Sequence, residues 1–161
     1  MTAVVDTNVA VVANRRSPQA SMDCILSCVE SLEQMVRQGQ VVLDDRWAIL
    51  SEYMRYLSRT GQPGVGDAFL KWILTNLGNR DRCELVSITP VDGDSGSFHE
   101  FPMDPALANF DPSDRKFVAV ARAHSSNPPI LQAVDWEWWT YRDLLKSHGV
   151  EIRFLCGGPG S

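Results

Sequence analysis

The chain has 161 residues, of which 44% are hydrophobic and 22% are charged, and its formal net charge is -5. This composition is typical of one soluble globular domain with a sizeable core. The negative charge excludes a global basic field, so any binding of nucleic acid would need a local basic patch. The sequence has no apolar run of about 18 residues and no signal-peptide pattern, so we expect a cytoplasmic protein without a membrane span.

The first half of the chain is predicted to alternate short apolar strands with amphipathic helices. The expected elements are strands over residues 2–6, 41–43 and 84–89 and helices over residues 20–38, 46–57 and 67–77. In the first of these helices, one apolar stripe is expected to face the core. It consists of Met22, Ile25, Leu26, Val29, Leu32, Met35 and Val36.

The second half begins with a long connection over residues 90–113, which is rich in proline and glycine; such loops tend to be functional. The elements expected after it are helices over residues 114–124 and 137–148 and strands over residues 130–134 and 150–155. Residues 157–161 are expected to form a flexible tail. The alternation predicts a single α/β domain over residues 1–156, with a parallel sheet covered by helices on both faces.

Acidic residues occur where this pattern brings chain segments to one edge of the sheet. Asp6 ends the first strand, and Asp135 directly follows the strand over residues 130–134. Asp114 lies in the first turn of the preceding helix, and Glu52 lies at the margin of an apolar helix face. Such folds bind ligands at the carboxyl ends of their strands. Clustered carboxylates repel one another unless cations neutralise them, and oxygen ligands favour Mg²⁺ or Mn²⁺.

Each of these acids also has a purely structural interpretation. The alternatives are a cap of the following turn or helix for Asp6, Asp114 and Asp135, and a solvated helical position for Glu52. Asp111 is expected to be an N-cap, because Pro112 follows it at a first helical position. Asp44 and Asp45 also follow an apolar strand, but they fit the N-cap of the next helix.

Four segments resemble the PIN-domain ribonucleases, and they are VVDTNV from Val4, LSEY around Glu52, DRKFVAVA from Asp114 and AVDWEW from Ala133. They occur in the family's order and extend over nearly the whole chain. The resemblance implies a three-layer α/β/α sandwich with a central parallel sheet. It also implies Mg²⁺- or Mn²⁺-dependent cleavage of phosphodiester bonds, usually in RNA.

The resemblance also implies roles for particular residues. The matched catalytic and metal-binding acids are Asp6, Glu52, Asp114 and Asp135. Asn8 matches a polar position that helps to orient the first acid. Glu137 matches an additional acid, although family members often have Asp there. Proteins of this family often form homodimers, and toxin-type members are held inactive by a small antitoxin protein.

Two pairs of basic residues are candidates for contact with the phosphates of RNA. Arg115 and Lys116 directly follow Asp114, and Arg15 and Arg16 follow the first strand. The alternative is that both pairs are ordinary solvated charges.

The four cysteines are Cys24, Cys28, Cys83 and Cys156, and none belongs to a CxxC pair. Cys24 and Cys28 lie four residues apart on one expected helix face, a spacing that can suit a metal ion. The sequence favours the alternative of buried free thiols in a reducing compartment.

Three functions therefore compete. The first is a metal-dependent ribonuclease of the toxin type. The second is a phosphate-handling domain with Asp6 as phosphoryl acceptor, which is weakened because Asn8 stands where a second acid would be expected. The third is a catalytically silent PIN-like binding module, against which the presence of all the matched acids argues.

Overall fold

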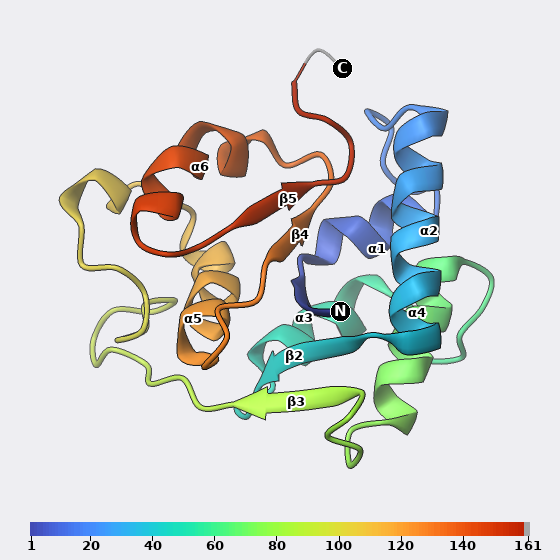
Figure 1. Cartoon of the computed structure of the whole chain (residues 1–161), viewed down its shortest axis with the longest axis horizontal. Coiled ribbons are helices and arrows are strands. Elements are labelled where there is room, and N and C mark those ends of the chain that lie inside the picture. The colour runs from blue at the N-terminus through green and yellow to red at the C-terminus, as the bar shows by residue number, and fades with distance from the viewer. Residues whose placement is uncertain (160–161) are drawn as a thin grey trace.

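The computed structural model describes residues 1–159 and has an α/β fold built around one five-stranded sheet (Figure 1). Its strands are β1 (Thr2–Val5), β2 (Gln40–Asp44), β3 (Cys83–Val86), β4 (Ile130–Gln132) and β5 (Ile152–Phe154). The strand order is β3-β2-β1-β4-β5, and every neighbouring pair is parallel. All the carboxyl ends therefore lie at the same edge, which confirms the predicted parallel sheet.

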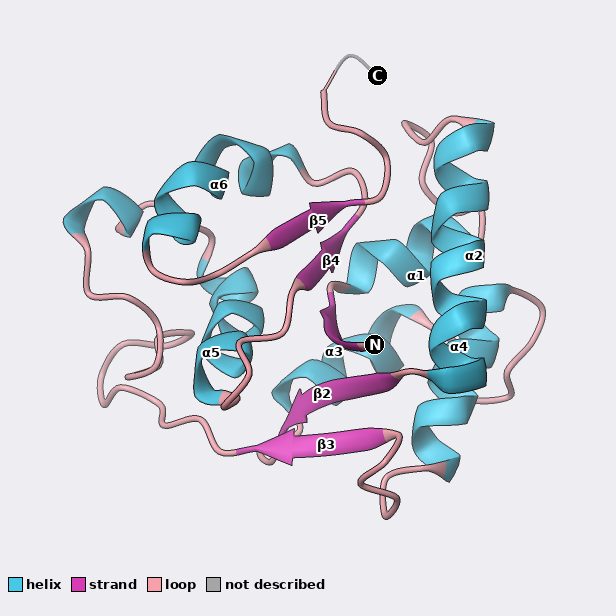
Figure 2. Cartoon of the chain, viewed as in Figure 1, coloured by secondary structure: helices cyan, strands magenta, loops and turns pink. Residues whose placement is uncertain are grey.

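Helices cover both faces of this sheet (Figure 2). They are α1 (Thr7–Ala13), α2 (Met22–Gln38), α3 (Ala48–Tyr56), α4 (Val65–Thr75), α5 (Arg115–Ala123) and α6 (Trp136–Ser147), with short 3-10 helices η1 (Pro105–Leu107) and η2 (Pro112–Asp114). Helices α1, α2 and α4 pack against one another on one face, whereas α5 and α6 contact the strands on the other. Helix α3 contacts β2, α1 and α5.

The core lies on both sides of the central strands. Ala3, Val4 and Val5 of β1 are fully buried, as are the apolar residues of β2. Continuous apolar runs of this kind are typical of strands that helices cover on both faces. None of the helices formed by residues 1–159 has the length and apolarity that a membrane span requires.

Helix α1 was not predicted, because its apolar residues do not form one stripe. Val9, Ala10, Val12 and Ala13 are all buried, so the helix has little polar face to reveal its period. It starts directly after β1, and this turn places Asp6 between the strand and the helix.

The predicted face of α2 was wrong by part of a turn. The residues that the helix buries are Cys24, Cys28, Leu32 and Met35. Of the predicted stripe, Leu26 is 49% exposed and Met22 is 55% exposed. The buried face thus lies on the side of α2 that carries Cys24 and Cys28, which the predicted stripe did not include.

The expectation of free thiols was also wrong for two cysteines. Cys24 on α2 and Cys156 after β5 form a disulfide across a sequence separation of 132 residues. Cys28 and Cys83 are free and buried, as predicted. The pairing depends on tertiary structure alone, because the fold brings the start of α2 to the segment that follows β5.

The segment expected to be a flexible tail is only partly described. Gly158 is buried, and a Cβ atom at this position would lie 2.6 Å from the Trp139 ring. The chain thus packs against the Trp139 ring of α6 at this point. Residues 160–161 of the expected tail lie outside the described residues.

Candidate functional site

An open pocket of about 520 Å³ lies at the carboxyl edge of the sheet, and it is lined by the four acids predicted to be catalytic but not by the additional acid Glu137. Its lining includes Asp6, Asn8, Glu52, Asp111, Asp114 and Asp135. These residues come from the ends of β1 and β4, from α1 and α3, and from the long connection before α5. The structure therefore brings together acids that are as far apart in the sequence as Asp6 and Asp135.

Asp6 occupies the turn between β1 and α1 and is only 4% exposed. Its carboxylate accepts hydrogen bonds from the Asn8 backbone N–H and from Gln132 Nε2, each at 3.0 Å. Burial is the largest cause that raises the pKa of Asp6, and the nearby carboxylates of Glu52 and Asp135 add to it; against the opposing effect of the hydrogen bonds, the pKa is raised to about 7. Asp6 thus caps α1, as the structural interpretation predicted, and also presents its carboxylate to the pocket.

Gln132 holds Asp6 and Asn8 together, and its role was not predicted. It ends β4 and is fully buried. Its side-chain oxygen accepts a hydrogen bond from Asn8 Nδ2, while Asn8 Oδ1 accepts one from the Ala133 N–H at 3.0 Å. The sequence signal that could have identified Gln132 is its place as a polar residue at the end of the apolar run Ile130–Leu131. The predicted orienting role of Asn8 fits these contacts, which fix the carboxylate of Asp6 through Gln132.

Asp114 adds a carboxylate from the long connection. Within residues 1–159 its side chain forms no helix-cap hydrogen bond, although the residue stands at the N-cap of α5. Burial, and after it the carboxylates of Asp6, Asp135, Asp111 and Glu137, together raise the pKa of Asp114 to about 9. Carboxylate oxygens of Asp111, Asp114 and Glu137 lie within 4.8 Å of one another.

Asp135 and Glu137 complete the acidic group at the start of α6. Asp135 caps α6 by accepting a hydrogen bond from the Glu137 N–H at 3.2 Å. Glu137 in turn accepts one from the Asp111 N–H at 3.1 Å. Burial is the largest cause that raises the pKa of both carboxyl groups. Asp111 caps η2 by accepting from the Ser113 N–H, as predicted, but it also adds a charge that the sequence did not assign to the site.

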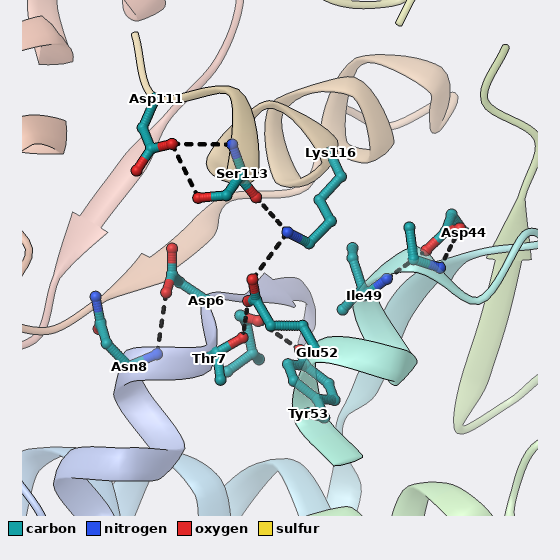
Figure 3. A network of polar contacts seen from close by, with 12 residues as sticks. Asp6, Thr7, Asn8, Asp44, Ile49, Glu52, Tyr53, Asp111, Ser113 and Lys116 are labelled. Carbon is teal, nitrogen blue, oxygen red and sulfur yellow. Dashed lines mark hydrogen bonds and ion pairs between the residues drawn. The ribbon is translucent and has the colours of Figure 1, made fainter. Parts of the chain in front are cut away.

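Glu52 differs from the other acids because a cation already compensates it (Figure 3). Lys116 Nζ lies 2.9 Å from Glu52 Oε1, and the hydroxyl of Thr7 donates to Oε2. Lys116 also donates to the carbonyl of Ser113. Both carboxylate oxygens of Glu52 thus already have protein partners. The prediction of Glu52 as a metal ligand did not foresee these contacts.

The position of Glu52 depends on the anchoring of α3. Asp44 is fully buried and accepts hydrogen bonds from the N–H groups of Ala48 at 2.8 Å and Ile49 at 2.9 Å. This confirms the structural role predicted for Asp44. Tyr53, next to Glu52, donates its hydroxyl to the carbonyl of Val5 (Figure 3). Helix α3 is therefore fixed to both β2 and β1, and it carries Glu52 to the rim of the pocket.

The predicted basic contacts are only partly placed at the site. Arg16 lines the pocket, whereas its neighbour Arg15 is exposed in the left-handed region with φ 61° and does not line it. Lys116 is 9% exposed and bound to Glu52. Arg115 points into the long connection, where its guanidinium donates to Ser97 Oγ at 2.7 Å and to the carbonyl of Phe110. Its predicted contact with phosphate does not fit this placement.

Three of the acids in the pocket differ from Glu52 in their lack of an ion pair with the described residues. Among residues 1–159, no basic side chain forms an ion pair within 4.0 Å of Asp6, Asp114 or Asp135. Carboxylates that are partly buried, close together and uncompensated must take up protons or bind a cation. Their oxygen-only donors fit a hard divalent ion such as Mg²⁺ or Mn²⁺.

Comparisons with models of protein families, with curated proteins and with solved structures find no match to this chain.

Proposed function

We propose that the chain is a metal-dependent ribonuclease that hydrolyses phosphodiester bonds at the acidic pocket. The observation that carries the proposal is the convergence of Asp6, Asp114 and Asp135 on one open pocket, where none of them forms an ion pair with a basic side chain of residues 1–159. A phosphodiester is an anion, so an acidic pocket favours its reaction only when a cation offsets the charge. Burial is the largest cause of the raised pKa values of these carboxyl groups, and neighbouring carboxylates add to it.

Asp6, Asp114 and Asp135 would hold Mg²⁺ or Mn²⁺ in this proposal. The bound ion supplies a water molecule of lowered pKa and offsets negative charge on the reacting phosphate. The protein contributes a fixed ligand, because Asn8 and Gln132 orient the carboxylate of Asp6. Such supporting contacts typically change metal affinity or activity by about 10- to 100-fold.

Other residues of the pocket would receive the RNA. Arg16 is placed to contact a backbone phosphate, and Trp136 offers an aromatic surface on which an unpaired base can stack. The pocket is open to solvent, which suits a polymer that enters and leaves at both sides. Glu52, held by Lys116 and Thr7, would order the rim and not compete for the ion.

The family assignment belongs to the same proposal. The order of the matched acids along the chain and their convergence at the edge of a parallel sheet support a PIN-like sandwich. We propose on that basis an RNA substrate, a cytoplasmic location and the pairing of two copies. A toxin-type role with an antitoxin partner also rests on the resemblance alone.

The proposal is tested by incubating a labelled pool of single-stranded RNA with the protein and Mn²⁺, Mg²⁺ or EDTA. We expect cleavage with either ion, none with EDTA, and a loss of roughly a thousandfold in Asp6→Asn. Asp143→Asn, an exposed acid on α6, is the matched control and should cleave as the wild type does.

Three results would overturn the proposal. Equal cleavage by wild type and Asp6→Asn would show that the activity lies elsewhere. Binding of RNA without any cleavage would favour a silent binding module. Transfer of phosphate from a small phosphodonor to Asp6 would favour a phosphate-handling domain.

A further inference from the structure

Three sulfur atoms meet between α2 and the end of β5, away from the acidic pocket. Cys24 and Cys28 are separated by one helical turn on the buried face of α2, and Cys156 lies two residues past β5. Cys24 and Cys156 form the disulfide, while Cys28 Sγ lies 4.0 Å from Cys156 Sγ. All three sulfur atoms lie within 4.8 Å of one another, and none of the three residues lines the acidic pocket.

The distance between Cys28 and Cys156 matches that of two thiolates on one metal ion. Sulfur ligands bind such ions at about 2.3 Å, so two of them lie about 3.8–4.0 Å apart in tetrahedral or trigonal geometry. Cys28 and Cys156 already have this separation. Opening the disulfide would leave Cys24 as a third ligand on the same helix face, so the backbone of α2 would not have to change.

We propose that the reduced chain binds one thiophilic ion, such as Cu⁺ or Zn²⁺, through Cys24, Cys28 and Cys156. Thiolates select soft ions, whereas the carboxylate pocket suits hard ones. The disulfide is the oxidised, metal-free form of the same site. This proposal does not depend on the ribonuclease proposal, because it uses different residues, different donor atoms and a different class of ion.

The two forms interconvert by a balanced reaction. A dithiol reductant supplies two electrons, the bond between Cys24 and Cys156 breaks, each sulfur gains a proton, and the reductant becomes a disulfide. Each thiol that then binds the ion releases its proton to solvent. Cys156 is only half-buried, so it offers a route by which a reductant and an ion reach the two buried thiols on α2.

Either form ties the segment after β5 to the start of α2. Cys24 is the third residue of α2, and the connection before this helix carries Arg16 on the wall of the acidic pocket. The sulfur site therefore lies close in sequence to a wall of the pocket. A metal ion would keep this tie in a reducing environment, in which a disulfide does not persist.

The experiment is a titration of the dithiol-reduced protein with Cd²⁺, which is a spectroscopic probe for thiolate sites. The ultraviolet absorption of the thiolate–metal bond monitors the titration. We expect the band to saturate at one equivalent of Cd²⁺. Cys28→Ser should weaken binding by about tenfold or more. Cys83→Ser is the matched control, because Cys83 is also free and buried but lies on β3, and it should bind as the wild type does. Protein with the disulfide intact should give no such band.

Two results would overturn the proposal. One is the absence of a thiolate band in the reduced wild type, and the other is binding of Cd²⁺ by Cys28→Ser with the affinity of the wild type. Cys156→Ser provides a second variant at a half-buried position, so that a folding defect of Cys28→Ser leaves the test intact. Circular dichroism of both variants checks the fold. Asp6→Asn should keep the band, which separates this site from the acidic pocket.

Discussion

Lys116 Nζ lies 2.9 Å from Glu52 Oε1, and the two side chains are only 11% and 15% exposed. This buried ion pair divides the acids of the pocket into two kinds. Glu52 is paired with Lys116, whereas no basic side chain in the described part of the chain pairs with Asp6, Asp114 or Asp135. The pair therefore compensates Glu52 alone and leaves the other carboxylates to bind an ion from solution.

Lys116→Met should destabilise the protein by about 3 kcal/mol, because it leaves the carboxylate of Glu52 buried without a cation. The double variant Lys116→Met, Glu52→Gln should recover most of this loss, since both charges are then absent. Urea unfolding of the wild type, both single variants and the double variant measures the effect. A Lys116→Met protein as stable as the wild type would show that the pair contributes nothing.

The stability of the metal-free protein should fall as the pH rises. The pKa of Asp6 is about 7 and that of Asp114 about 9 in the folded state, against an ordinary value of 3.8. Between these values the folded state holds protons that the unfolded chain has released, so each step in pH lowers the free energy of unfolding. Below about pH 4 both states are protonated and the full stability is present.

Thermal unfolding in EDTA from pH 4 to pH 9 measures this dependence. One pKa unit corresponds to about 1.4 kcal/mol, so Asp6 alone accounts for a few kcal/mol across this range. Addition of Mn²⁺ at pH 8 should restore much of the loss. A melting temperature that rises steadily from pH 4 to pH 9 in EDTA would contradict the assignment.

Asp6→Asn should make the metal-free protein more stable at pH 8, because it removes a buried charge and retains an oxygen that can cap α1. The gain should be on the order of 1–3 kcal/mol, and it should vanish at pH 4, where Asp6 of the wild type is protonated. Comparative melts at both pH values decide the matter. A variant that is less stable than the wild type at pH 8 would mean that the carboxylate holds the fold together.

Gln132→Leu should cost about 1–3 kcal/mol, because Asp6 and Asn8 each lose a buried hydrogen-bond partner. It should also lower the rate of RNA cleavage by about 10- to 100-fold through the misplaced carboxylate of Asp6. Gln19→Leu, on the exposed wall of the same pocket, is the control and should change stability little. The orienting role fails if both variants cleave at the wild-type rate.

Arg16→Ala should weaken RNA binding uniformly across sequences and reduce the dependence of log affinity on log salt by about 1. Arg15→Ala is the matched control, because Arg15 is the adjacent arginine but does not line the pocket. Each substitution is made separately in an Asp6→Asn background, which prevents cleavage during the titration, and the binding of RNA is then measured. Equal effects of the two substitutions would remove Arg16 from the proposed contact.

Several features of this molecule that depend on local pattern were predicted from the sequence. The position of Asp6 was predicted correctly, because the end of an apolar strand determines where the next side chain lies. The structural role of Asp44 was predicted correctly, because a helix cap depends on neighbouring residues. Gln132 was missed, since its importance depends on the side chains that meet it from β1 and α1. The contacts of Arg115 with Ser97 and Phe110 were missed for the same reason, so its predicted contact with phosphate does not fit the structure. The disulfide between Cys24 and Cys156 depends on a contact between distant segments, which no local pattern contains.

The binding of Mn²⁺ to the acidic pocket tests the proposed metal site most directly, and electron paramagnetic resonance of the free ion at pH 8 measures it. We expect one tight equivalent in the wild type, because Lys116 keeps Glu52 from holding a second ion. We also expect the loss of that equivalent in Asp6→Asn and its retention in Asp143→Asn. Absence of binding in the wild type, or equal binding by Asp6→Asn, would contradict the proposed metal site.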